Sequence, residues 1–268
     1  MKLRSIALNT FGLFLRDRLL IVFAALFVCV ILLMMTPLLG VRAKTTASNF
    51  QGAQAYVLEL VAAISYMVSG AGSLLAAWTA ADSIAMEMKS GTILAVMARP
   101  VKRWEFLLGK YLGVLLLMML YVLMMVALSF LLAWMGGQRI HSSVRILIVY
   151  PLVRYAVYAA IAMAVGTIAH PVVTWAFTLL LGVAAGMVVP GGEPSTHAAL
   201  RWLKTGLYYV LPSTNFLSED RFLTIKHASL RQTAWIEHLT TLSYGLDYAL
   251  VFLLVAMWSF HYRSLKRD

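Results

Sequence analysis

Three ionisable residues lie at or just inside the ends of long uncharged stretches of the chain: Glu59, Arg154 and Asp247. If such stretches cross a membrane, charges at that depth are rare and often contact a substrate or form part of a gate. Interfacial anchoring, or one structural ion pair, is the other interpretation, and the sequence leaves both open. We predict that Arg154 forms an ion pair with Glu59 or with Asp247.

The remaining residues that could do chemistry match no catalytic or metal-binding pattern. The chain contains neither G-x-x-x-x-G-K-[ST], which binds phosphate, nor H-E-x-x-H, which binds zinc. The run Ser-Gly-Ala-Gly-Ser at 69–73 is similar to a nucleophile turn, but no base is paired with it. Met118 and Met125 share a helical face that would suit Cu(I), although methionine is commonly an apolar filler. We expect no catalytic residue, no metal and no cofactor in this chain.

The composition indicates that lipid is part of the solvent of this chain. Of its 268 residues 62% are hydrophobic and 12% are charged, and the mean hydropathy is +0.83. Soluble domains have roughly 45–50% apolar and about 25% charged residues. The net charge of +11 does not predict nucleic-acid binding, because the basic residues lie at the ends of apolar stretches and not on one polar face.

The hydropathy pattern predicts an all-α polytopic membrane protein with six transmembrane helices and a single domain over residues 1–268. Residues 1–18 are too charged to span and have apolar residues at helical spacing, which predicts an amphipathic surface helix. Residues 190–241 are mixed in polarity and predict a re-entrant or loop segment outside the membrane. The six predicted spans are 19–39, 60–81, 106–135, 146–169, 171–189 and 242–260.

The positions of the basic residues predict the orientation of these spans. With the N-terminus inside, twelve basic residues near span ends lie on the inner side and four lie in the two short outer loops. Cytoplasmic loops carry the excess of Lys and Arg. We therefore expect both termini and residues 82–110 to lie in the cytoplasm.

Small residues recur at every fourth position of the second predicted span. Ser65, Ser69, Ser73 and Ala77 make one such row, which would let another helix approach closely in lipid. This helix-packing seam lies either inside one subunit, or between subunits or along a gate.

Residues 82–110 form the only long polar segment in the first half of the chain, with five basic and three acidic residues between two predicted spans. Gly91 suits a helix end, and the Arg99-Pro100 step suits the start of another helix. Charged and apolar side chains are therefore held together in a helix–break–helix unit, which predicts a docking element for a partner in the cytoplasm.

The residues of this segment resemble the signature of the permease subunits of ABC-2 type transporters. The matching residues are Glu87, Gly91-Thr92-Ile93, Ala98-Arg99-Pro100-Val101, Arg103-Trp104-Glu105-Phe106, Gly109-Lys110-Tyr111 and Gly113. The resemblance extends to the order of surface helix, spans and outer segment. Within the family, the permeases encoded beside nitrous-oxide-reductase maturation factors are the branch to compare first.

The resemblance implies a transport subunit of an exporter in the cytoplasmic (inner) membrane, with a second permease copy in a homodimer. A separate ABC ATPase subunit would hold ATP and magnesium and would contact the coupling residues. Those residues are Glu87, Gly91, Thr92, Arg99, Pro100, Arg103, Trp104, Glu105, Gly109 and Lys110. The alternative is a membrane carrier or an assembly scaffold that works without an ATPase, and neither the sequence nor the resemblance identifies a substrate.

Overall fold

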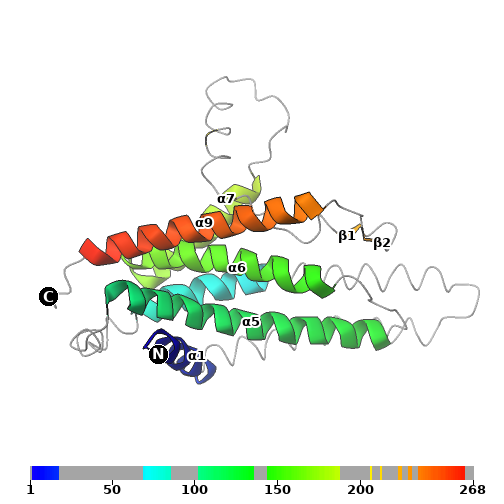
Figure 1. Ribbon diagram of the computed structural model, residues 1–268, viewed down its shortest axis with the longest axis horizontal. Coiled ribbons are helices and arrows are strands. Elements are labelled where there is room, and N and C mark those ends of the chain that lie inside the picture. Colours follow the sequence, from blue (N-terminus) through cyan, green and yellow to red (C-terminus); the bar gives the residue numbers. More distant parts are fainter. Residues whose placement is uncertain are drawn as a thin grey trace, which may run out of the picture.

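The computed structural model describes residues 2–17, 69–85, 102–135, 144–187, 206, 212, 223–224, 229–230 and 235–262. Its helices are α1 (Lys2–Leu15), an unlabelled helix over 69–85, α5 (Arg103–Met135), α6 (Val144–Gly166), α7 (Pro171–Met187) and α9 (Trp235–Tyr262). Long helices lie side by side in a bundle, with α1 against one end of it (Figure 1).

The helical fold predicted from the sequence is confirmed. Within the described ranges, α5, α6 and α9 are long and apolar enough to cross a membrane, and α1 and α7 contain shorter apolar helices. The predicted spans 60–81, 106–135, 146–169, 171–189 and 242–260 all overlap described helices, whereas 19–39 lies outside the described residues. The six-span count and the membrane orientation stay predictions.

Several element boundaries differ by a few residues from those predicted, and two of these differences arise where polar residues continue or end a helix. The last helix begins at Trp235 instead of 242, because the polar residues before the apolar stretch continue its backbone hydrogen bonding. The fourth predicted span ends at Gly166, since Thr167–His170 turn the chain before Pro171 starts α7.

Part of the predicted outer segment 190–241 is a short antiparallel ladder. The two-residue strands β1 (Leu223–Thr224) and β2 (Ser229–Leu230) pair Leu223 with Leu230 and Thr224 with Ser229. This ladder is a small exception to the all-α prediction, which helical periodicity could not detect.

Contacts between the helices fix their relative directions. Ser69 meets Arg154 and Ala81 meets Gly166, so helix 69–85 runs parallel to α6. Tyr158 of α6 packs on Gly182, which makes α7 antiparallel to α6 because Gly166 also lies beside the start of α7. The helices connected by chain reversal therefore alternate in direction, as consecutive spans must.

The pairing of α9 with its neighbours completes this pattern. The Tyr150 hydroxyl hydrogen-bonds His238 near the start of α9, and the Thr167 hydroxyl hydrogen-bonds Ser259 near its end, at 2.9 Å. Thus α9 runs parallel to α6. Helix α5 runs antiparallel to α9. Phe106 near the start of α5 stacks on Phe260 near the end of α9, with ring centroids 6.0 Å apart.

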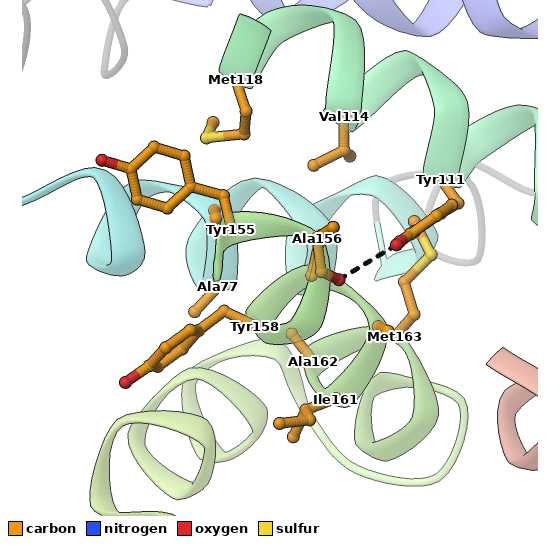
Figure 2. Packing of buried hydrophobic residues seen from close by; sticks show 14 of the residues in the cluster. Ala77, Tyr111, Val114, Met118, Tyr155, Ala156, Tyr158, Ile161, Ala162 and Met163 are labelled. Carbon is orange, nitrogen blue, oxygen red and sulfur yellow. Dashed lines mark hydrogen bonds between the residues drawn. The ribbon is translucent and has the colours of Figure 1, made fainter. Parts of the chain in front are cut away.

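The core of the bundle is centred on α6. Every side chain from Tyr155 to Ala164 is buried, and five of these ten residues are alanines. Small side chains let helices approach closely in lipid, where packing drives association more than hydrophobicity does. Figure 2 shows α6 enclosed by α5, helix 69–85 and α7, with the Tyr111 hydroxyl donating to the carbonyl of Ala156 at 3.1 Å.

Candidate functional site

The start of α5, where the predicted coupling residues enter the described structure, is capped by Glu105. Glu105 Oε2 accepts a hydrogen bond from the backbone N–H of Lys102 at 3.0 Å, three residues earlier. This is the return half of a capping box, in which an acidic side chain in the first turn satisfies a backbone donor that has no helical partner. The negative charge also suits the positive end of the helix dipole. Glu105 therefore fixes where α5 begins.

Arg103 connects the start of α5 to the end of α9. Its Nη1 donates to the carbonyl oxygens of Phe260 at 3.2 Å and His261 at 2.8 Å. The last carbonyls of a helix lack backbone donors and carry its negative dipole end, so a guanidinium is a favourable partner there. With the stacking of Phe106 on Phe260, these bonds hold the two helix ends together.

Gly109 and Gly113 form the surface of α5 on which α1 lies. A Cβ at Gly109 would approach Ile6 Cγ2 to 2.7 Å, and one at Gly113 would approach Thr10 Cβ to 2.6 Å and the Ala7 carbonyl oxygen to 2.9 Å. The absence of both Cβ atoms allows the close approach of the two backbones. Both glycines belong to the signature recognised in the sequence, but their Gly-x-x-x-Gly spacing, which also predicts such a contact, went unrecognised there.

The other described coupling residues lie on two sides of α5. Trp104 is exposed and suits the membrane–water interface. Lys110 is 3% exposed, with Nζ 5.8 Å from the centroid of the Phe106 ring, within the range of a cation–π contact. Lys110 is therefore buried beside the stacked rings of Phe106 and Phe260, at the same helix junction as Arg103.

The first turns of α5 therefore join α1 and α9 at one end of the bundle, and Tyr111 in the next turn bonds α6 (Figure 1). The other predicted coupling residues, Glu87, Gly91, Thr92, Arg99 and Pro100, lie outside the described residues. Arg103 and Glu105 have structural partners within the chain, and a contact with a partner ATPase stays a prediction for all ten residues.

The predicted outer charge cluster has a different set of contacts from the one expected. Arg154 Nη1 donates to Ser69 Oγ at 3.0 Å, and its guanidinium also interacts with the Tyr158 hydroxyl. Asp247 is exposed on α9. Among the described residues Arg154 forms no ion pair with Asp247, because Arg154 turns into the bundle towards helix 69–85. Glu59 lies outside the described residues, so the alternative pair stays a prediction.

The row of small residues in the second predicted span lies inside the chain. Ser69 and Ser73 are 3% and 4% exposed and Ala77 is fully buried, while Ser65 lies outside the described residues. Ser73 Oγ donates to the backbone carbonyl of Ser69 at 2.9 Å, which gives it a helix-internal partner. The described part of this seam therefore packs within one subunit.

Several apolar helices long enough to span a bilayer, joined through small residues and with a charged junction at one end, define a multi-pass α-helical membrane protein. The chain matches the family described as ABC-2 family transporter protein over residues 4–265 and belongs to that family. It is thus a membrane component of an ABC transporter and not an enzyme by itself. The curated proteins compared with the chain gave no match.

Proposed function

We propose that this chain is the permease subunit of an ABC exporter in the cytoplasmic (inner) membrane, driven by a separate ATPase subunit. ATP binding would close two ATPase subunits. Their movement would reach the permease through residues 82–110 and α1, and the spans would reorient to move substrate outward. ATP and magnesium belong to the ATPase.

The junction at the start of α5 is the observation that carries this proposal. A force applied to the chain before Lys102 acts on a helix whose first turns contact α9 and α1. Helices joined by hydrogen bonds and close glycine packing move together, as a coupling element requires. A slack loop before an isolated span would dissipate the same movement.

A second permease copy is supported by the outward face of α9. Of the three long apolar helices α9 is the least buried within the chain, and Asp247 is exposed on it. An ionised carboxylate facing hydrocarbon is unfavourable, so such residues in spans usually face protein or water. We infer that α9 faces a second copy of the chain in a homodimer.

The experiment is co-expression with a candidate ABC ATPase from the same organism, followed by purification in mild detergent and reconstitution. We expect the two chains to co-elute with a mass that fits two copies of each, and we expect the permease to stimulate ATP hydrolysis. Arg103→Ala should lower that stimulation while membrane insertion is unchanged, because the link between α5 and α9 is lost.

A permease that elutes alone and leaves ATP hydrolysis unchanged would favour the carrier or scaffold instead. Unaltered stimulation by Arg103→Ala would keep the complex but reject the junction as its coupling element. A mass that fits one permease copy would reject the homodimer but leave the rest of the proposal standing.

A further inference from the structure

Arg154 is a cation held inside the bundle. It is the only charged residue in the apolar window Ile148–Gly166 of α6. At 1.5 Å per residue it lies about 9 Å from the start of this window and about 18 Å from its end. An arginine at that depth commonly extends to the interface to reach water. Here the bond to Ser69 Oγ holds the guanidinium between α6 and helix 69–85 instead.

Among the described residues, the partners of this guanidinium include no carboxylate. Its described partners are two neutral hydroxyl groups, those of Ser69 and Tyr158. Arg154 Nε is buried and has no hydrogen-bond acceptor in the part of the chain that the structure describes. A buried donor of this kind is costly unless something accepts its hydrogen bond, and a charged donor is more costly still.

The surroundings are built to hold these groups in place. A Cβ at Gly182 of α7 would collide with the Tyr158 ring, approaching Cε1 to 2.7 Å, so glycine at this position makes room for the tyrosine. Gly72 makes room in the same way for the ring of Tyr155, one residue after Arg154. In Figure 2 the two rings leave α6 on the same side, Tyr155 towards helix 69–85 and Tyr158 towards α7.

We propose that Arg154, Tyr158 and Ser69 form an oxyanion site, which takes a phosphate or carboxylate group within the bundle. The planar guanidinium offers parallel N–H donors that match two oxygens of such a group, and the tyrosine hydroxyl adds a further donor. Arg154 is only half-buried, so part of it remains accessible to a ligand.

The ligand class follows from the depth of the site. An oxyanion that reaches it comes either as the headgroup of an amphiphile whose tails stay in the bilayer, or as a free ion. The existence of the binding site does not depend on the proposed function. The further step, that its ligand is the exported substrate, rests on the proposed function.

The test uses the full chain purified in dodecyl maltoside without any ATPase. Its thermal unfolding midpoint is measured against increasing dioleoylphosphatidylglycerol, dioleoylglycerol and inorganic phosphate, since a ligand that binds the folded state raises the midpoint. We expect the phosphatidylglycerol to stabilise the wild type and the dioleoylglycerol, which lacks phosphate, to do so far less. An equal response to inorganic phosphate would identify a free oxyanion as the ligand.

Arg154→Gln should require about tenfold more phosphatidylglycerol for the same shift of the unfolding midpoint, because it removes the positive charge and the paired N–H donors of the guanidinium. Tyr158→Phe keeps the packed ring, so it should fold even if Arg154→Gln does not, and it should lose a smaller part of the response. Arg139→Gln removes one basic residue elsewhere and should respond like the wild type. Wild-type responses from both Arg154→Gln and Tyr158→Phe, or equal stabilisation by dioleoylglycerol, would overturn the site. Because no ATPase is present, these outcomes are independent of the proposed transport function.

Discussion

At the scale of single residues, the signature around the start of α5 acts largely through contacts within the chain. Glu105 caps α5, Arg103 binds the end of α9, and Gly113 lies under α1. An alanine substitution lowers activity both at a residue that binds a partner directly and at a residue that only shapes the local structure, so it cannot distinguish the two roles. The substitution must therefore separate charge from hydrogen bonding.

Glu105 offers such a separation. Glu105→Gln keeps an oxygen that can accept from the Lys102 N–H, whereas Glu105→Ala removes it and should destabilise the start of α5 by up to about 1 kcal/mol. We expect Glu105→Ala to lower the stimulation of ATP hydrolysis and Glu105→Gln to retain most of it. If glutamine is as harmful as alanine in the same assay, the carboxylate charge itself contacts the partner.

At the scale of elements, the contact between α1 and α5 depends on Gly109 and Gly113, which have no Cβ atom. The buried face of α1 includes Ala7, Thr10 and Phe14, and the first two of these lie against Gly113. Leu8 and Leu13 of α1 remain exposed, as expected for a helix that also lies in the membrane surface. The helix is thus held by α5 on one side and by lipid on another.

Gly113→Ala tests this contact. Its Cβ would meet the backbone oxygen of Ala7 as well as Thr10 Cβ, so we expect overpacking to cost about 1–3 kcal/mol and to lower the thermal unfolding midpoint in detergent. Gly109→Ala should also lower the midpoint, because its new Cβ would approach Ile6 Cγ2 to 2.7 Å and Ile6 Cβ to 2.9 Å, atoms close to the backbone of α1.

The matched control is Gly12→Ala, where a new Cβ meets nothing within 4 Å. The better helix propensity of alanine should leave the midpoint unchanged or raise it slightly. An increase for Gly113→Ala equal to that of Gly12→Ala would mean that α1 does not pack closely on α5.

At the scale of the whole molecule, one end of the bundle brings together α1, the start of α5, the α6–α7 turn and the end of α9 (Figure 1). The basic residues Arg4, Arg16, Lys102 and Arg103 all belong to this end. The positive-inside rule predicts that this is the cytoplasmic end. The helix directions require these segments to share one side of the membrane.

Cysteine labelling in intact cells tests this orientation. Cys29 is the only native cysteine, so Cys29→Ser gives a background without thiols. Ile168 in the α6–α7 turn is 73% exposed, and Ile168→Cys should react with a membrane-permeant maleimide but not with an impermeant one. Gln138→Cys, in the predicted outer loop, should react with both. The reverse result at the two positions would invert the orientation.

The sequence by itself determined the helical membrane class, because long apolar stretches in a short chain have few other solutions. It also placed a break between the predicted spans 146–169 and 171–189, where the structure turns the chain before Pro171, since proline interrupts helices in a recognisable way. Local composition decides these features. The predicted junctions at Gly91 and Arg99-Pro100 lie outside the described residues.

Only the tertiary structure decided which side chains meet. It gave Arg154 the hydroxyl of Ser69 as a partner, 85 positions away in sequence, and it placed Asp247 on an outward face of α9. It also turned Arg103 towards α9 and made Gly113 the contact for α1. The physical reason is that hydropathy sets how deep a residue lies, but the rotation and pairing of helices depend on packing between distant segments.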